Sequence, residues 1–244
     1  MDFKKFKRLS LKFLWLIIFK FKYHKSPKTI ITSYEHRGLK KYVKNPNLII
    51  DIGFNKGQFS SLALEYWPKV PLIAFDPHPF ACKKASTKLK NSYKNFEFRN
   101  KGISRTHKNY LKLNLADKSD NSSFLYPTNL NNKLFKETKI KGEYLTKVNT
   151  IENEINPKKF KSNWLIKIDV QGSEMDVLES FSEEQYNKIK WIYMEVTDLL
   201  LYKKQASSKK LKEFLESKDF KLIESFNSNY LDGKLIYADF LFEK

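Results

Sequence analysis

Asn-Leu-Ile-Ile-Asp-Ile-Gly-Phe-Asn-Lys-Gly-Gln-Phe, residues 47–59, runs from a short apolar stretch into a turn that carries Gly53 and Gly57. A second apolar stretch, residues 71–75, follows it and ends in an acid, Asp76. A buried strand, a glycine turn, a helix and a second strand ending in a carboxylate form the first half of a nucleotide-binding βαβ unit. The glycines let the backbone approach a ligand closely, and the terminal acid can accept both hydroxyls of a ribose.

The turn differs from the dinucleotide fingerprint Gly-x-Gly-x-x-Gly. Asn55 stands at its middle position, and no third glycine follows Gly57. The pattern therefore indicates a cofactor that has a ribose and no pyrophosphate. S-adenosylmethionine fits that description.

Length and composition favour one large α/β domain with a short appendage. The chain has 244 residues, of which 41% are hydrophobic and 15% aromatic, enough for a buried core. We place the domain at residues 30–244 and the appendage at residues 1–25. The single cysteine, Cys82, excludes an internal disulfide and fits a reducing compartment.

The formal charge of +19 raises the question of nucleic-acid binding. Only four of the 46 basic residues are arginines, whereas phosphate and base-edge recognition favours the arginine fork. We therefore interpret the charge mainly as a solvated lysine surface and expect no specific nucleic-acid partner.

Residues 1–25 have a composition of their own. A wholly apolar centre, residues 13–19, lies between basic flanks, and residues 1–28 carry nine basic side chains against Asp2. The centre is far shorter than the ~20 residues that cross a bilayer. Two interpretations stay open: a helix lying on an anionic membrane surface, or a helix docked on protein.

Alternating and apolar stretches predict the remaining elements. Helices are expected at about 33–43, 57–66, from 79 onward, 175–181 and 208–217, and strands at 96–98, 109–116, 164–170, 190–196, 220–226 and 235–242. Residues 117–145 have little periodicity and are expected to form an irregular insertion near the site. Asp232-Gly233 predicts a hairpin turn. The pattern as a whole predicts a doubly wound, mostly parallel sheet with a C-terminal antiparallel hairpin.

Three segments resemble the FkbM family of S-adenosylmethionine-dependent methyltransferases. They are residues 51–59, Ala-Phe-Asp-Pro at 74–77, and above all the run from Leu165 to Glu179, Leu-Ile-Lys-Ile-Asp-Val-Gln-Gly-Ser-Glu-Met-Asp-Val-Leu-Glu. Ser122-Ser123-Phe124 and residues 148–152 are similar as well. The resemblance covers about residues 45–200 and implies the class I, Rossmann-like methyltransferase fold. The family usually has Glu where this chain has Gln171.

The resemblance and the expected fold together assign roles to individual residues. Ligands of open α/β sheets bind at the carboxyl ends of the strands, which puts Asp51, Asp76, Asp169 and Glu195 along one edge. We expect the methionyl part of S-adenosylmethionine to be surrounded by the side chains and backbone of Asp51, Gly53, Asn55, Gly57 and Gln58. Asp76 is expected on the ribose. Asp169 is expected beside the transferred methyl group, where it orients the cofactor's amine, acts as a base, or binds a cation together with Glu195.

Two further candidates for catalysis are Glu174 and His78. Glu174 is either catalytic or a first-turn acid stabilised by the helix dipole. His78 lies near the expected ribose edge as a base or as a packing group, and Asp76 has helix capping as its alternative role. Lys167, inside a predicted buried strand, is expected to form an ion pair with a neighbouring acid. No His/Cys cluster indicates a metal site, and metal dependence stays undetermined.

The resemblance implies O-methylation of a hydroxyl on a sugar, a glycan or a related small molecule. The alternatives are an RNA methyltransferase, or a non-catalytic membrane-associated protein with the same fold. We expect a cytoplasmic protein, with residues 1–25 holding it at the inner membrane face if they bind lipid. The sequence leaves the oligomeric state open.

Deletion of residues 1–25 tests the membrane-surface interpretation. We expect the deletion to abolish binding to anionic vesicles and to leave cofactor affinity intact, because the cofactor turn begins only at Asp51. Binding of the full chain should weaken with salt, since each lysine near a charged leaflet contributes ~1 kcal/mol that is screened over a Debye length. Co-sedimentation with vesicles measures both effects, and equal sedimentation of the two proteins would contradict the interpretation.

Overall fold

The computed structural model describes residues 34–106, 108–135 and 137–244. The segment 1–25 that was interpreted as an interfacial or docking helix lies outside these residues. Within them, no helix is both long enough and apolar enough to cross a membrane.

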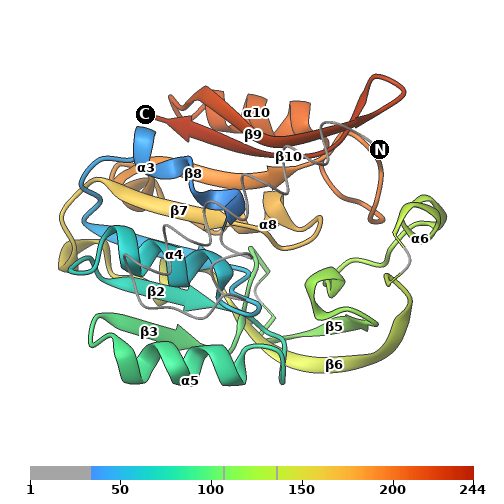
Figure 1. Ribbon diagram of the computed structural model, residues 1–244, viewed down its shortest axis with the longest axis horizontal. Coiled ribbons are helices and arrows are strands. Elements are labelled where there is room, and N and C mark those ends of the chain that lie inside the picture. The colour runs from blue at the N-terminus through green and yellow to red at the C-terminus, as the bar shows by residue number, and fades with distance from the viewer. Residues whose placement is uncertain (1–33, 107, 136) are drawn as a thin grey trace.

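A seven-stranded sheet organises the domain, in the order β3-β2-β1-β7-β8-β10-β9 (Figure 1). Its parallel strands are β1 (Leu48–Ile52), β2 (Leu72–Phe75), β3 (Phe96–Arg99), β7 (Trp164–Ile168) and β8 (Ile189–Val196). The hairpin of β9 (Lys221–Leu231) and β10 (Lys234–Glu243) adds antiparallel to β8. This order, with its reversed last strand, is that of the class I methyltransferase fold, as the sequence predicted.

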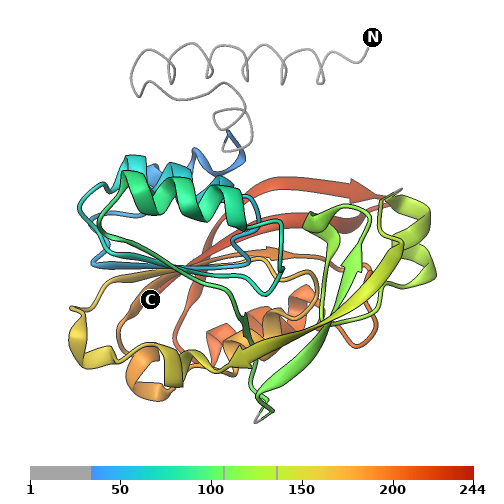
Figure 2. The same ribbon diagram turned by 90° about the horizontal axis from the view of Figure 1, so that it is seen from below.

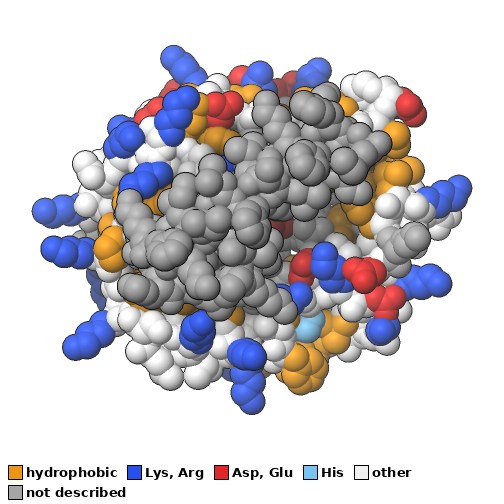
Figure 3. All heavy atoms as spheres, in the orientation of Figure 1, with side chains coloured by type: hydrophobic (Ala, Val, Ile, Leu, Met, Phe, Trp, Pro, Cys, Tyr) orange, Lys and Arg blue, Asp and Glu red, His pale blue; other side chains and the backbone are white. Residues whose placement is uncertain are grey.

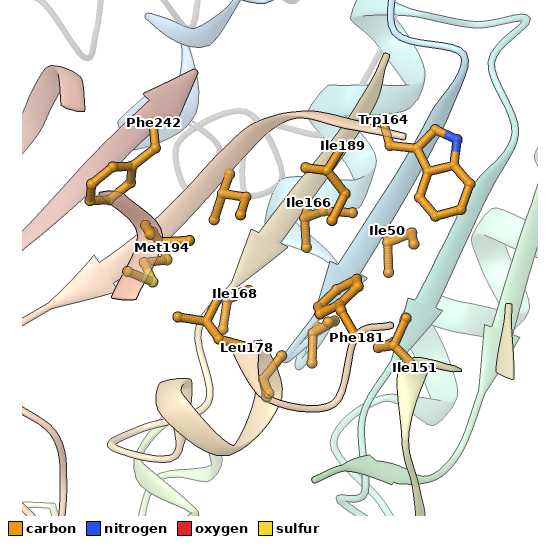
Figure 4. Packing of buried hydrophobic residues seen from close by; sticks show 14 of the residues in the cluster. Ile50, Ile151, Trp164, Ile166, Ile168, Leu178, Phe181, Ile189, Met194 and Phe242 are labelled. Carbon is orange, nitrogen blue, oxygen red and sulfur yellow. The ribbon is translucent and has the colours of Figure 1, made fainter. Parts of the chain in front are cut away.

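Helices cover both faces of this sheet (Figure 2). On one face lie α3 (Leu39–Tyr42), α4 (Gln58–Tyr66) and α5 (Lys83–Ser92), and on the other lie α8 (Glu174–Leu178), α9 (Glu183–Tyr186) and α10 (Ser208–Glu216). Strand residues alternate between the two faces. Ile50, Ile166 and Ile168 pack on the α8–α10 side (Figure 4), whereas Ile49 and Leu165 pack on the α4 side.

The terminal hairpin closes through Asp232 and Gly233, with φ angles of 49° and 75°. Two consecutive positive φ values are what a two-residue hairpin turn with the twist of its strands requires. The predicted hairpin signal is confirmed, although β9 extends to Leu231, beyond the predicted end at 226.

Two predictions were wrong. The helix expected from Pro79 begins only at Lys83. Residues 79–82 form a turn before it, and the backbone N–H groups of residues 78, 80 and 81 donate to the Asp76 carboxylate and the His78 ring. Residues 117–145 are not wholly irregular. They contain η2 (Ser119–Asn121), α6 (Asn129–Leu134) and the first half of β6 (Ile140–Asn149).

Strand β6 forms a small second sheet with β4 (Gly102–Ile103) and β5 (Tyr110–Ala116), in the order β4-β6-β5. Only two of its ten residues are buried, so no apolar alternation marks it in the sequence. The remaining short elements are η1 (Tyr34–His36), α7 (Ile151–Glu154) and η3 (Pro157–Lys159). The small sheet lies beside the large one and holds the segment that follows β5 next to its carboxyl edge (Figures 1 and 2).

Replacement of Gly53 should disrupt the junction between β1 and β7. Gly53 has φ +91°, and a Cβ there would lie 1.8 Å from the carbonyl oxygen of Asp169. We expect Gly53→Ala to lower the free energy of unfolding by more than about 3 kcal/mol, because both the backbone conformation and the close contact exclude a side chain. Denaturant titration measures the loss.

Gly142 provides the matched control, since a Cβ there has no atom within 4 Å. Gly142→Ala should change the unfolding free energy by less than about 0.5 kcal/mol. Equal stability of the two variants would contradict this account of Gly53.

Candidate functional site

A cavity of about 400 Å³ opens at the carboxyl ends of β1, β2, β7 and β8. This volume is within the range of small-molecule sites, and the position is where open α/β sheets bind ligands. The glycine turn, the segment 118–135, the hairpin β9–β10 and η1 supply the rest of its wall.

The turn after β1 is wound tightly. Gly53, Asn55 and Gly57 all have positive φ angles, of 91°, 47° and 72°. Gly53, Asn55 and Gln58 line the cavity. Gly57 lies behind it, where a Cβ would come within 2.7 Å of the Phe54 ring.

Asn55 connects this turn with the insertion. Its side-chain amide donates to the Asp120 carboxylate at 2.7 Å, and the Lys56 ammonium lies 3.0 Å from the same oxygen. Burial raises the pKa of Asp120, but these two partners outweigh burial and lower it to about 2. Asp120 is therefore ionised and holds η2 against the turn.

Asp76 follows β2 and lines the cavity, as predicted for the acid that binds ribose. Its carboxylate accepts hydrogen bonds from the backbone N–H groups of Asn55 at 2.7 Å and His78 at 2.8 Å. Burial raises the pKa of Asp76, and these hydrogen bonds oppose that effect. Each carboxylate oxygen keeps a second acceptor position for a ligand hydroxyl.

Asp51 lies one layer below the cavity and is not among its lining residues. It is completely buried, accepts a hydrogen bond from Ser60 at 2.6 Å, and forms an ion pair with Lys167 at 3.3 Å. Lys167 also lies 3.6 Å from the Asp169 carboxylate and donates to the Gly53 carbonyl at 2.7 Å. The ion pair expected for Lys167 is confirmed.

Asp169 lines the cavity directly after β7 and is linked to Gln171. The Gln171 amide donates to Asp169 at 2.9 Å and to Glu195 at 3.0 Å, while its carbonyl oxygen accepts from the Tyr202 hydroxyl at 3.0 Å. Burial, and then the charge of Asp169, raises the pKa of Glu195 well above its ordinary value. One amide group thus holds two neighbouring carboxyl groups at a fixed spacing.

Glu174 lies outside the cavity lining. Its carboxylate accepts hydrogen bonds from the backbone of Gly172 at 3.0 Å and Val170 at 3.4 Å. Burial raises the pKa of Glu174 to about 7. These contacts hold the loop that carries Asp169 and Gln171.

His78 lines the cavity, but its Nδ1 accepts from the backbone N–H groups of Phe80 at 3.2 Å and Ala81 at 3.1 Å. Burial lowers its pKa, so the neutral ring carries its proton on Nε2. A ring in this state has no lone pair left with which to take a proton from a ligand.

The sequence interpretation missed a second group of lining residues, His36, Asn227 and Asp239, and the buried Tyr193 behind them. His36 Nδ1 lies 3.0 Å from the Tyr193 hydroxyl, and Asn227 donates to Asp239 at 2.6 Å. Burial raises the pKa of Asp239 to about 6. The alternation of β8 places Tyr193 and Glu195 on one face, which was the available sequence signal; no local motif marks His36 or Asp239.

The donors and acceptors of the cavity fit S-adenosylmethionine. A carboxylate ends β2, an ion-paired carboxylate follows β7, and a tight turn without the third glycine of a pyrophosphate site lies between them. Among the described residues no three His, Cys, Asp or Glu side chains are grouped as metal ligands.

Comparison with known proteins gives the same assignment. The sequence model of the FkbM methyltransferase domain matches residues 51–222, whereas no curated protein matches the chain.

Similar solved structures include the tRNA methyltransferase TrmK of B. subtilis, with 12% identity, 86% of this chain and 65% of that chain covered, and a TM-score of 0.45. Another is the 1,6-didemethyltoxoflavin-N1-methyltransferase of Burkholderia thailandensis, with 10% identity, coverage of 87% and 76%, and a TM-score of 0.46. A third is the precorrin-6y C5,15-methyltransferase of Geobacter metallireducens, with 11% identity, coverage of 88% and 86%, and a TM-score of 0.46.

The chain thus spans slightly less than two thirds of the TrmK chain. The match over residues 51–222 includes both strand ends and the glycine turn that form the cavity. The chain belongs to the FkbM family of methyltransferase domains, whose methyl donor is S-adenosylmethionine.

Proposed function

We propose that the protein is an O-methyltransferase whose acceptor is a hydroxyl of an uncharged, polyhydroxylated molecule such as a sugar or glycan. The observation that carries this proposal is the chemistry of the cavity wall beyond the cofactor turn. Hydroxyl and amide side chains line it together with aromatic rings: Ser119, Asn121, Ser122, Ser123, Phe124, Asn131, Phe135, Asn227 and Tyr237. Hydroxyls and amides both donate and accept, which suits an acceptor covered with hydroxyls.

The charge of the wall favours an acceptor without phosphates. Six lining residues are acids, namely Glu35, Asp76, Asp120, Asp169, Glu195 and Asp239, against the lysines 101, 118 and 167. Each of these lysines already forms an ion pair. Lys101 pairs with Glu154 at 2.9 Å, Lys118 with Asp120 at 3.3 Å, and Lys167 with Asp51 at 3.3 Å. A phosphate entering this cavity would meet carboxylates and no unpaired ammonium among the described lining residues.

The excess of acids in the cavity lining also argues against the RNA methyltransferase alternative. Among the residues that the structure describes, the lysine and arginine side chains visible in Figure 3 lie scattered around the rim of this face. Salt-sensitive binding of RNA at nanomolar concentration would reverse this preference. Cofactor binding without methyl transfer to any acceptor would favour the non-catalytic alternative.

Within this proposal, Asp76 binds the ribose hydroxyls, and Gly53, Asn55 and Gln58 contact the methionyl part of the cofactor. Asp169 binds the cofactor's ammonium group, because Asp169 lines the cavity directly after β7. Asp51 does not line the cavity; its role is to hold Lys167 in place through their ion pair. The sulfonium supplies the methyl group, so the protein's main task is to hold the acceptor oxygen in line with it.

Glu174 is proposed as a positioning residue, because its carboxylate faces backbone N–H groups and not the cavity. His78 is likewise proposed to shape the turn after Asp76 through the two N–H groups that its ring accepts.

Assay of methyl transfer tests the function. The protein is incubated with methyl-labelled S-adenosylmethionine and matched acceptors: neutral sugars, their phosphate esters, and RNA. We expect label in the neutral sugars, in a base-stable ether. Transfer to RNA or to phosphorylated sugars in preference to neutral ones would contradict the proposal.

Replacement of Asp76 should weaken binding of S-adenosylmethionine. We expect Asp76→Asn to raise the dissociation constant roughly tenfold to a hundredfold, since a hydrogen bond to a charged group contributes about 1.5–3 kcal/mol. Calorimetry measures the affinity. Asp176→Asn is the control, because Asp176 pairs with Arg105 outside the cavity lining and should leave affinity unchanged. Equal affinity of Asp76→Asn and the wild type would contradict the ribose assignment.

Glu174 should make stability depend on pH. Its pKa rises from 4.5 to about 7 on folding, so the folded chain binds more protons than the unfolded chain between these values. The unfolding free energy therefore falls as pH rises through this window, by up to roughly 3 kcal/mol for this group. Glu174→Gln keeps an acceptor oxygen and should remove that part of the fall, measured by denaturant titration from pH 4 to pH 8.

Glu184, an exposed acid in the first turn of α9, provides the control for this prediction. Glu184→Gln should leave the pH dependence as in the wild type. If Glu174→Gln also follows the wild-type curve, the buried carboxyl of Glu174 is not the cause.

A further inference from the structure

Helix α5 carries lysines that the rest of the described chain leaves unpaired. Four of its lysines are exposed, and the helix contains no acidic residue: Lys83, Lys84, Lys88 and Lys90. Helix α10 differs, because its Lys209 and Lys212 form ion pairs with acids four residues further along the same helix. The α5 lysines have no such partner among the described residues.

The helix presents these lysines on one side. A helix advances about 100° per residue, so the four lysines fall within one half of its circumference. Ser86 and Leu89 fall within the other half and are buried, with Leu89 in the core on this side of the sheet. Helix α5 lies at the edge of the domain beside β3 (Figure 1), and its lysine side is directed toward solvent.

A phenylalanine stands at the beginning of this lysine side. Phe80 is 72% exposed, more than any other large hydrophobic side chain of the described residues. Its carbonyl oxygen accepts from the backbone N–H of Lys83 at 3.3 Å, so Phe80 lies one turn before the first lysine. Its ring contacts the ring of His78, which lines the cavity, with 6.4 Å between the centroids. We call the set the α5 patch: Phe80, Lys83, Lys84, Lys88 and Lys90.

We propose that the α5 patch binds the headgroup region of an anionic membrane, with the Phe80 ring among the lipids and the lysines on the lipid phosphates. An exposed aromatic ring beside unpaired lysines is typical of protein surfaces that lie on anionic bilayers. Charge complementarity supports this partner, because the patch has four positive charges and no negative one. The patch consists only of residues of the methyltransferase domain, and its binding does not depend on which acceptor is methylated.

A nucleic acid fits this patch less well. The patch contains lysines and no arginine, whereas phosphate and base recognition favours the planar arginine fork. Proteins that bind single strands by charge and stacking use a groove that follows the backbone. The α5 lysines instead lie on the convex side of an exposed helix, from which their long side chains can reach a planar surface together.

This orientation has a consequence for the cavity. Pro77 and His78, which come directly before the turn that carries Phe80, line the cavity. A Phe80 ring held among lipids therefore keeps the cavity close to the headgroup layer.

A fluorophore at position 80 reports on the patch alone. Phe80→Cys in the full chain is labelled with an environment-sensitive dye, and the unsubstituted chain gives the background from Cys82, which is buried. With vesicles of equal parts phosphatidylglycerol and phosphatidylcholine, we expect a blue shift and quenching by spin-labelled lipid. Vesicles of phosphatidylcholine alone should produce neither effect.

Tyr230→Cys is the matched control for the dye. Tyr230 is 61% exposed and lies on β9, at the opposite edge of the seven-stranded sheet from β3 and α5. A dye at position 230 should stay in water with both kinds of vesicle.

Neutral substitutions test the lysines. The combined variant Lys83→Gln, Lys84→Gln and Lys88→Gln should bind the anionic vesicles roughly 100-fold more weakly, since each lysine near a charged leaflet contributes about fivefold. The matched control combines Lys158→Gln, Lys159→Gln and Lys161→Gln. These exposed lysines flank Phe160, which packs on the opposite face of the sheet, and their replacement lowers the net charge equally. The control should bind less than about threefold more weakly. Co-sedimentation measures both affinities.

Three outcomes would overturn the proposal. One is a dye at position 80 that stays in water with anionic vesicles, whether or not the chain sediments with them. Another is equal loss of vesicle binding in the two triple variants, which would assign the attraction to net charge. The third is salt-sensitive RNA binding that only the α5 variant loses, without any dye response to vesicles. Every substituted residue lies outside the cavity lining, so unchanged affinity for S-adenosylmethionine verifies that each variant is folded.

Discussion

The buried ammonium group of Lys167 is the interaction on which the rest of the site depends. It lies in β7, the middle strand of the seven-stranded sheet, 5% exposed, between the carboxylates of Asp51 and Asp169, and it donates to the Gly53 carbonyl. Burial alone would lower its pKa, but the two acids outweigh burial and raise it. Removing one partner of such a buried group leaves an uncompensated charge, which destabilises a protein by about 3–5 kcal/mol. One cation thus joins β1, the glycine turn and the loop after β7.

Charge is divided unequally between the surface and the cavity. The chain carries a net +19, yet acids outnumber lysines in the cavity lining. Long lysine side chains keep their ammonium groups in water at little cost, whereas buried carboxyl groups are stable only with hydrogen-bond donors or with a proton. Backbone N–H groups, the Gln171 amide and Lys167 supply these partners. The total charge of the chain is therefore a poor guide to its ligand.

Gln171 shows how a single departure from the family pattern changes the electrostatics of this site. An amide donates to Asp169 and Glu195 together, where the carboxylate usual in the family would be a third acceptor facing them. Its φ of 56°, followed by φ 98° at Gly172, bends the loop so that both contacts form. A Cβ at Gly172 would lie 2.9 Å from Tyr202, the residue that donates to the Gln171 carbonyl. Gln171 and Tyr202 therefore hold the loop after β7, with Asp169, against Glu195 of β8.

The sequence by itself determined the βαβ order, the reversed last strand with its Asp232-Gly233 turn, and the strand-end acids Asp76 and Asp169, because each depends on local periodicity or on turn chemistry. It also placed Gly53, Asn55, Gln58 and His78 at the cavity. Only the tertiary structure decided which groups line the cavity: Asp51, Gly57 and Glu174 lie outside the lining. It also showed that β6 forms in a stretch without apolar alternation. The contact of His36 with Tyr193 joins residues 157 positions apart through strand register and helix packing, and no local pattern encodes such a pairing.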